Sequence, residues 1–491
     1  MLLLNTIRRF RINTSNPLGN SRVINLLSLI VMSSLLVPAT NALGQTDSAE
    51  ITPQSLPSTN TPPPKAWIDA DTGHRVVRLT DEANSRVLPT GNAYTPDGRD
   101  MVYVAPRGIH LVNLATFKTK LIISGGISGD VIVGTKTRRV FYQQSRTVYF
   151  SAVDIDTGKV THLGTMPPGG FISSINADET LAVGTVIKPG EQNFLDFYDK
   201  TLREHTAEIK SNHSNTESIE DAKQKAMKMR LDARIPESMF VMNLQTGEVK
   251  TILQGTDWLS HAQFSPTDPT LIMYEHEGPY AEKDLDRVWT IRSDGSQNKL
   301  VHPRLIPGET TAHPFWSQDG KTIWYERRKP KHDDPTWSDH HLVGFDVTTG
   351  NSKLFYLDQL TASTFYSPAN NGAFFCGSGH YSKAAHGNKP PTQGQIQWSG
   401  EWIYVYYPIL NNTDIGTNPQ DAGLFHFNNP TSDPDSGAKF TGWFRREPLV
   451  NMFKNDYTKL EPNVRFSPDN KLVIFTSNMF GPTYVFAVEV N

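Results

Sequence analysis

The sequence predicts an all-β protein, a seven-bladed β-propeller, from a repeated unit and its turn chemistry. The unit recurs from residue 90 onward. Its first half is an aromatic residue, a turn of the Ser/Thr-Pro-Asp kind and an apolar strand, and its second half is a strand that ends in Asp/Asn-x-x-Thr-Gly. Each unit is roughly 40–50 residues long and there are about seven of them, as in a propeller of four-stranded blades.

Copies of the first half can be aligned directly. The clearest begin with AYTPDG, QFSPTD, FWSQDG and RFSPDN, and weaker ones with SINADE and YSPANN. Aromatic residues make up 10% of the chain and long runs of helix formers are scarce, which favours short strands joined by turns. The copies lie at 93–105, 263–275, 315–326 and 465–477, with the weaker ones at 174–185 and 366–377.

The two ends of the repeat predict how the ring closes. The last unit ends at Val490 and has no outer strand, whereas residues 73–80 read as an outer strand without a blade of its own. An N-terminal strand that completes the last blade would remove two sheet edges. We therefore expect a propeller closed by its N-terminal strand.

The N-terminal region is predicted to be an export signal. A basic start is followed by an apolar run at 23–36 and by small residues, which is typical of a secretory signal peptide over 1–42. The run is too short for a membrane-spanning helix, and an uncleaved anchor is the alternative. Residues 43–64 are rich in Ser, Thr and Pro and read as a linker, which leaves 65–491 for the propeller. We expect a periplasmic or secreted protein with no membrane contact after signal removal.

The net charge and the cysteine content limit the kinds of partner and cross-link that the chain can have. The net charge of −3 over 491 residues is too small to indicate a nucleic-acid partner. Cys376 is the single cysteine, so no internal disulfide can form, and we expect it to be a buried structural thiol. We also expect the protein to be a monomer.

One insertion, at about 188–234, breaks the repeat. Its centre, 216–230, has helix formers with apolar residues at helical spacing, so the insertion is predicted to be partly helical. A long charged insertion on a rigid scaffold is either a functional flap or a solvated surface helix. The apolar residues are Ile219, Ala222, Ala226 and Met229.

Three histidines lie at the edges of successive apolar runs, namely His261, His276 and His313. They converge on one face of the ring if their strands belong to neighbouring blades. Each also has a structural interpretation: a hydrogen-bonded strand-edge residue for His261, a brace for the HEGP turn through Glu277 for His276, and a packed residue for His313. The histidines at 340, 341, 380 and 386 are expected in solvated loops.

The ordered motifs WLSH, HEGP and AHPFWSQDG resemble those of the oligogalacturonate lyases, and the similarity spans roughly residues 66–491. The resemblance implies a seven-bladed propeller that cleaves short pectin fragments by β-elimination with the help of a divalent metal. It also implies that His261 is the base and His313 a metal ligand.

The sequence departs from the family at the remaining metal ligands. A Gln-x-x-His-x-His segment supplies them in the family, whereas this chain has Thr458-Lys-Leu-Glu461-Pro-Asn463. Oxygen ligands suit hard cations, so Glu461 and Asn463 could hold Mn²⁺ or Ca²⁺ together with His313. Alternatively no metal binds and arginines neutralise the substrate carboxylate.

The chemistry of elimination assigns the other candidates. A base must remove the proton next to the uronate carboxylate, and a cation must neutralise the charge that builds there. Neutral imidazole suits the first role, because its ordinary pKa lies near working pH. We expect Arg234 and Arg287 to act with His261 in catalysis, and Arg230 and His276 to bind substrate.

The function that follows is an exported polysaccharide lyase that acts on oligogalacturonate, an acidic oligosaccharide. Two alternatives stay open: a lyase for another uronic-acid polymer such as ulvan, and a non-catalytic TolB-like propeller that binds protein or glycan. A hydrolase with paired carboxylates is less favoured, because no Asp/Glu pair stands out at matching strand edges.

Overall fold

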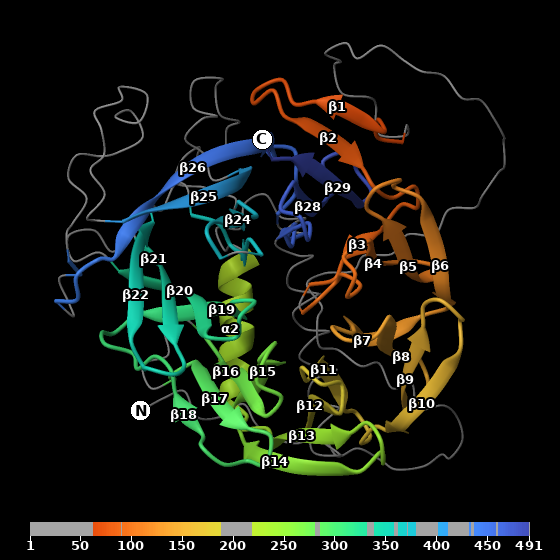
Figure 1. Ribbon diagram of the computed structural model, residues 1–491. Coiled ribbons are helices and arrows are strands. Elements are labelled where there is room, and N and C mark those ends of the chain that lie inside the picture. Colours follow the sequence, from red (N-terminus) through yellow and green to blue (C-terminus); the bar gives the residue numbers. More distant parts are fainter. Residues whose placement is uncertain are drawn as a thin grey trace, which may run out of the picture.

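The sheets of the molecule follow one another around a ring in chain order, as Figure 1 shows. The architecture is all-β with one helix in the part described by this computed structural model. The described residues are 62–89, 91–187, 219–279, 285–330, 338–357, 362–370, 372–379, 401–410, 432–433, 437–457 and 460–490.

Four of the sheets are antiparallel meanders of four strands. The first two consist of β3 (Arg86–Val87), β4 (Asp100–Ala105), β5 (Gly108–Asn113) and β6 (Thr119–Ser124), and of β7 (Ile127–Val133), β8 (Arg139–Gln144), β9 (Tyr149–Asp154) and β10 (Val160–Thr165). The next two consist of β11 (Phe171–Ile175), β12 (Leu181–Ile187), β13 (Glu237–Asn243) and β14 (Val249–Gly255), and of β15 (Trp258–Phe264), β16 (Leu271–Glu277), β17 (Val288–Arg292) and β18 (Lys299–Leu300).

An eight-stranded sheet joins two further meanders. Their outer strands run parallel, with Phe355 opposite Gly442 and Tyr356 opposite Trp443. The strands are β19 (Thr310–Trp316), β20 (Thr322–Pro330), β21 (Ser338–Asp346) and β22 (Ser352–Leu357), and β23 (Tyr366–Pro368), β24 (Phe375–Gly377), β25 (Trp402–Leu410) and β26 (Gly442–Asn451).

The last sheet combines strands from the two ends of the described chain. Strand β2 pairs with β29, with Val76 opposite Val488 and Val77 opposite Ala487. Both valines are buried. The strands in spatial order are β1 (Ala66–Ile68), β2 (Arg75–Arg78), β29 (Tyr484–Glu489), β28 (Leu472–Ser477) and β27 (Arg465–Phe466).

The repeated Asp/Asn-x-x-Thr-Gly signature forms side-chain-capped turns, as its residue types predict. Asp154 accepts hydrogen bonds from the backbone N–H and the hydroxyl of Thr157, and Gly158 follows at φ 71°. Asp346 and Gly350 repeat this arrangement after β21. A carboxylate that mimics a backbone turn, followed by a residue free to adopt positive φ, is why this motif ends a strand.

The core lies between neighbouring sheets, because the strands are buried on both faces. Val76 packs in one apolar cluster and Val77 in the next, so β2 contributes to two of them. Cys376 is fully buried, as expected of a structural thiol.

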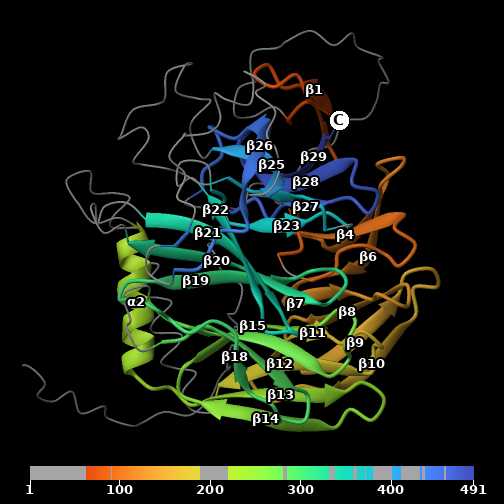
Figure 2. The same ribbon diagram turned by 60° about the vertical axis from the view of Figure 1, so that its left-hand side comes forward.

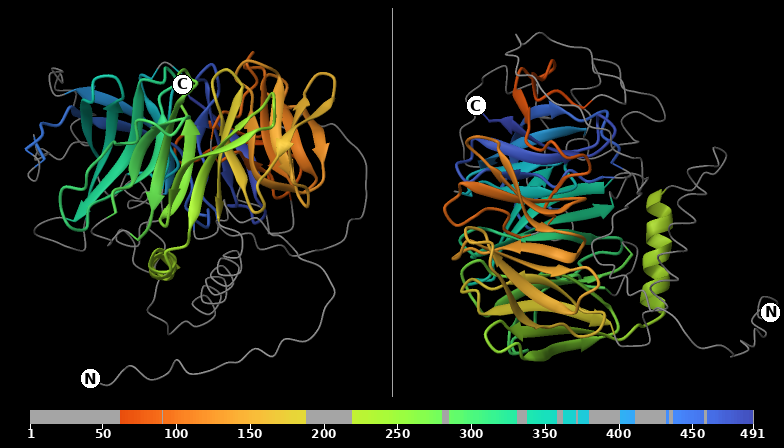
Figure 3. Two further views of the ribbon diagram at one scale, coloured as in Figure 1. Left: turned by 90° about the horizontal axis from the view of Figure 1, so that it is seen from below. Right: turned by 90° about the vertical axis from the view of Figure 1, so that its right-hand side faces the viewer.

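Helix α2 (Ile219–Asp232) lies across one face of the ring (Figures 2 and 3). It confirms the helix predicted at the centre of the insertion, and residues 188–218 of that insertion lie outside the described part. The described residues include no helix long and apolar enough to cross a membrane.

The prediction of a solvated loop at His340–His341 is wrong. Both residues belong to β21, and His341 is 1% exposed and stacks on Phe440 with ring centroids 5.4 Å apart. The alternation of the strand, which the neighbouring Pro, Asp and Lys residues obscured, turns His341 inward. His380, His386 and residues 1–61, with the predicted signal peptide, lie outside the described residues.

Candidate active site around His261

Two of the predicted histidines occupy strained positions on the first strands of neighbouring sheets. His261 has φ 52° at a register shift between Ser260 and Gln263 of β15. His313 has φ 52° at the corresponding shift in β19. Bulky residues rarely adopt positive φ, and such bulges re-aim side chains and concentrate near active sites. The backbone therefore marks both histidines as candidates.

Asn463 occupies the same place in another repeat. Its φ is also 52°, and it lies four positions before Ser467, as His261 and His313 lie before Ser265 and Ser317. The repeat thus places the predicted base and two of the predicted metal ligands at equivalent points of three sheets.

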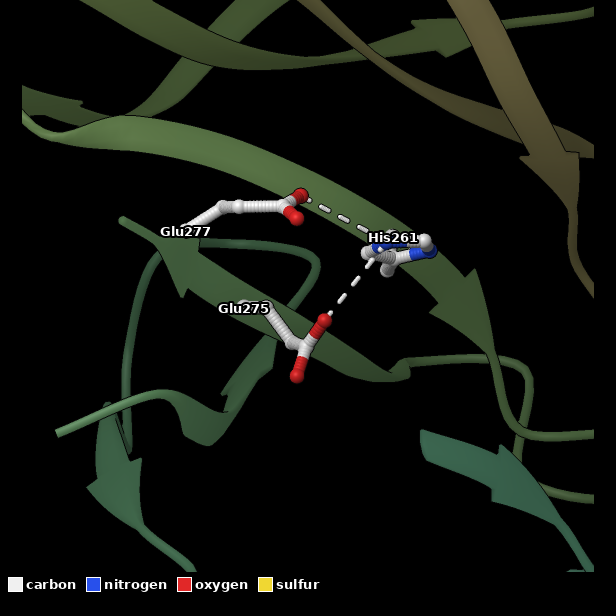
Figure 4. Close-up of side chains that lie close together, drawn as sticks. All are labelled: His261, Glu275 and Glu277. Carbon is white, nitrogen blue, oxygen red and sulfur yellow. Dashed lines mark ion pairs between the residues drawn. The ribbon is translucent and has the colours of Figure 1, made fainter. Parts of the chain in front are cut away.

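His261 lies beside two carboxylates of the adjacent strand β16 (Figure 4). Its Nε2 is 3.6 Å from Oε2 of Glu275 and 3.5 Å from Oε2 of Glu277. Residues two apart on a strand share a face, which explains why both glutamates reach one imidazole. Pairing of β15 with β16 sets Glu275 opposite Ser260 and Glu277 opposite Trp258.

Arg287, just before β17, contacts the other oxygens of the same carboxylates. Its Nε is 3.8 Å from Oε1 of Glu275, and its terminal nitrogen Nη2 is 3.5 Å from Oε1 of Glu277. Nη1 donates a hydrogen bond of 2.9 Å to the carbonyl of Gly278. The guanidinium therefore holds both carboxylates with one oxygen toward His261.

The electrostatics of the cluster favour a protonated imidazole. Burial lowers the pKa of His261, but the carboxylates of Glu277 and Glu275 outweigh burial and raise the pKa to about 9. The side chain is 32% exposed, so solvent and small ligands reach it. The sequence suggested a neutral imidazole with a pKa near working pH, whereas Glu275 and Glu277, which were not recognised as its partners, favour the charged form.

The pKa values of the two glutamates are shifted in opposite directions. Burial raises the pKa of Glu275, against the effect of Arg287 and His261. For Glu277 burial also raises the pKa, but the close contact with His261 and the charge of Arg287 outweigh burial and hold the pKa far below the ordinary range. Glu277 is thus the carboxylate that stays charged opposite the imidazole.

His276 lies outside this cluster. It alternates with Glu275 and Glu277 along β16, and its Nδ1 is 3.3 Å from Oδ2 of Asp257. Burial lowers its pKa, with Asp257 acting in the opposite direction. The expected brace through Glu277 is replaced by a contact with Asp257, at the start of β15.

His313 has its own carboxylate. Its Nδ1 is 3.0 Å from Oε1 of Glu326, whose other oxygen pairs with Arg328. The ring also packs 4.3 Å from that of Phe365. A carboxylate on one ring nitrogen is the usual support for a histidine that ligates a metal through the other. Glu461 and Asn463, the other predicted ligands, precede β27 and carry side-chain oxygens of the kind that a hard divalent cation accepts.

The predicted arginines occupy three different environments. Arg230 of α2 is buried, 3.3 Å from Glu237 and stacked 4.1 Å above the Trp258 ring. Arg234 is 68% exposed and 3.9 Å from Asp257. Arg287 alone of the three contacts the His261 cluster directly.

Glu275, Glu277, Glu326 and Arg328 were not identified as site residues from the sequence. The signal for the first two was present, because YEHE places carboxylates two apart on a strand that pairs with WLSH. For Glu326 and Arg328 the register of β19 with β20 was needed, in which Ala312 faces Glu326 across the bulge.

Comparisons with known proteins agree with the motif resemblance. Residues 219–379 match the family model described as oligogalacturonate lyase. An oligogalacturonate lyase of Dickeya dadantii is 38% identical over 250 residues, and an oligogalacturonide lyase of Pectobacterium atrosepticum is 26% identical over 250 residues. Each alignment covers 51% of this chain and 54% of the relative, so the chain spans about half the length of the curated relatives it matches.

Two solved structures share the fold over most of the chain. One is an oligogalacturonate lyase in complex with manganese, with a TM-score of 0.60 and 20% identity. The other is an oligogalacturonate lyase from Vibrio parahaemolyticus, with a TM-score of 0.60 and 19% identity. Each match covers 87% of this chain and 96% of the other, which confirms the fold predicted from the repeats as all-β and propeller-like.

Proposed function

We propose that this chain, a relative of the oligogalacturonate lyases, is an exported polysaccharide lyase that cleaves oligogalacturonate by β-elimination. The observation that carries the proposal is His261, held at a strained bulge against Glu275 and Glu277 within the residues that match the family model. Export rests on the signal-like N-terminus of the sequence.

His261 acts as the base in this mechanism. After losing its own proton, Nε2 takes the proton from the carbon next to the uronate carboxylate. The electron pair forms the 4,5-double bond, the bond from carbon 4 to the glycosidic oxygen breaks, and the departing oxygen takes up a proton. Glu277 stabilises the imidazolium that forms, as a carboxylate does beside a catalytic histidine.

Charge on the substrate carboxylate is neutralised by cations of this chain. Arg234 is exposed and makes only a long 3.9 Å contact with Asp257, so its guanidinium is accessible to a uronate. Arg287 is buried against Glu275 and Glu277, so we assign it to holding these carboxylates rather than to binding sugar. Arg230 anchors α2 beside Trp258 at the start of β15.

His313, Glu461 and Asn463 would hold the divalent cation that the resemblance implies. Bound there, it would supply a Lewis acid for the substrate carboxylate. Glu326 would keep the His313 ring in the orientation that presents Nε2.

We also infer that the sheets are the blades of a seven-bladed propeller. The eight-stranded sheet supplies two blades joined at their outer edges, and β2 completes the blade of β27, β28 and β29. Such a ring would bring the equivalent positions of His261, His313 and Asn463, each with φ 52°, around one axis.

The test is an absorbance assay for the double bond with purified protein and oligogalacturonate, with and without Mn²⁺. We expect product from the native chain and at least a 100-fold lower rate from His261→Ala. A flat trace under both conditions, with product on ulvan, would move the proposal to that polymer.

One observation favours a second candidate, a non-catalytic propeller that binds glycan. The residues at 458–463 lack the Gln-x-x-His-x-His ligands of the family. This candidate expects no product from any uronate polymer and equal glycan affinity for the native chain and His261→Ala.

A further inference from the structure

The His261 cluster has the spacing of a coordination shell rather than of hydrogen bonds. Nε2 of His261 lies 3.6 and 3.5 Å from the two carboxylate oxygens, and the three ligand atoms lie within 4.8 Å of one another. Hydrogen bonds to charged groups are shorter, at about 2.7–2.9 Å. Ligands placed about 2.1 Å from a tetrahedral centre are about 3.4 Å apart. The observed separations match the second value.

Glu275 points independently to a ligand. Its side chain is fully buried, and neither of its carboxylate oxygens has a hydrogen-bond partner. A buried carboxylate without hydrogen bonds is strongly unfavourable unless a cation compensates it. Its contacts with His261 and Arg287, at 3.6 and 3.8 Å, are ionic and too long to be hydrogen bonds.

Arg287 arranges the carboxylates as a supporting residue of a metal site would. It contacts Oε1 of Glu275 and of Glu277, and Oε2 of each faces the imidazole. The guanidinium thus compensates the charge of the two Oε1 atoms and leaves both Oε2 atoms directed toward the imidazole of His261. Such support normally orients and tunes metal ligands.

We propose that His261, Glu275 and Glu277 form a binding site for a divalent cation that accepts nitrogen and oxygen ligands, such as Zn²⁺. One imidazole and two carboxylates suit this class of ion. Its ligands differ from those assigned with His313, although the His313 charge acts on Glu275 and lowers its pKa. The cation would occupy the lone pair that His261 needs as a base, so it would inhibit elimination, a consequence that rests on the proposed function.

Binding can be measured without reference to activity. The full chain is stripped with EDTA and titrated with Zn²⁺ by calorimetry. We expect a saturable site whose affinity falls at least about 10-fold in Glu277→Gln and in Glu275→Gln, and is retained in His313→Ala. Glu277 is the more exposed carboxylate, so Glu277→Gln preserves a folded protein if Glu275→Gln does not, and thermal unfolding checks both.

Cobalt reports the ligands directly. Co²⁺ added to the stripped protein should give visible absorption bands that disappear in Glu277→Gln and persist in His313→Ala. Affinity lost in His313→Ala but kept in Glu277→Gln would overturn the proposal, as would the absence of saturable binding. Zn²⁺ that binds at this site yet leaves the elimination rate unchanged would overturn only its inhibitory role, and a chain without lyase activity would leave the binding result intact.

Discussion

The contact between His261 and Glu277 sets the protonation of the proposed base. Because the carboxylates raise the pKa of His261 to about 9, the imidazole of the free protein is charged at neutral pH. A base must be unprotonated, so a rising pH increases the competent fraction until the pH passes the pKa. The proposed elimination should therefore be favoured by alkaline conditions or by a substrate whose binding displaces the proton.

We expect kcat/KM, measured with Mn²⁺ present and Zn²⁺ excluded, to rise with pH up to about 9. Glu277→Gln removes a carboxylate whose negative charge raises that pKa, so the rising limb should move to lower pH. Asp257→Asn serves as the control, because its carboxylate contacts His276 and not His261. If the rising part of the pH profile lies at the same pH in Glu277→Gln as in the native chain, a group other than His261 controls it.

Some residues of the candidate site could be predicted from the sequence and others could not. The motifs identified His261 and His313, and the structure places both at equivalent bulges with carboxylate partners. Glu275 and Glu277 needed strand alternation together with the pairing of β16 against β15. The burial of His341 depends on packing against Phe440, which is about 100 residues away in the sequence. Local sequence patterns therefore could not predict it.

At the level of elements, α2 is held to the ring through Arg230. The guanidinium pairs with buried Glu237, which also accepts the backbone N–H of Leu259, next to Trp258. The insertion is thereby tied to the same strand that carries His261.

Arg230→Met should destabilise the protein by roughly 3–5 kcal/mol, because Glu237 would remain as a buried charge without its partner. Urea unfolding measures the change. Lys228→Met on the same helix removes an exposed pair with Asp232, and should cost under about 0.5 kcal/mol. Equal effects of the two substitutions would mean that α2 is not anchored by Arg230.

Strand β21 carries a second electrostatic feature, at His341. Burial, together with the charges of Arg327 and Lys329, lowers its pKa to about 3. The unfolded chain binds the proton near pH 6.5 and the folded chain does not, so this residue removes stability as the pH falls from about 6.5 toward 3.

His341→Phe should flatten the loss of stability between about pH 6 and pH 4, because phenylalanine keeps the stacking on Phe440 without a titrating group. The free energy of unfolding is compared at both pH values in the variant and the native chain. His162→Phe, on β10, is the control. A pH dependence unchanged by His341→Phe would contradict the buried neutral state.

For the whole molecule, the pairing of β2 with β29 decides whether the ring has an open edge. Val76 and Val77 are buried in two apolar clusters. Loss of β2 would expose both the ladder of β29 and apolar surface.

A chain that begins at residue 81 should therefore aggregate or unfold at a lower temperature than one that begins at residue 62. Size-exclusion chromatography and thermal unfolding compare the two. The longer chain keeps β1 and β2 and is the matched control. Equal behaviour would show that β29 does not need its N-terminal neighbour.

The repeat was predictable because each unit carries its own strand and turn signals. The joining of two meanders into one sheet was not, because β22 and β26 are separated by 84 residues between Leu357 and Gly442. No local pattern encodes a parallel contact between outer strands so far apart, and it depends on long β25 and β26 reaching their neighbour.

That shared ladder makes the two meanders one cooperative body. When thermal fluctuation loosens either of them, the pairing at Phe355 and Tyr356 transmits the disturbance to its partner. Among the described residues, no other two meanders are joined in this way by their outer strands. Hydrogen exchange should accordingly show one common opening free energy for the amides of β19–β26. The ring should open first between other sheets.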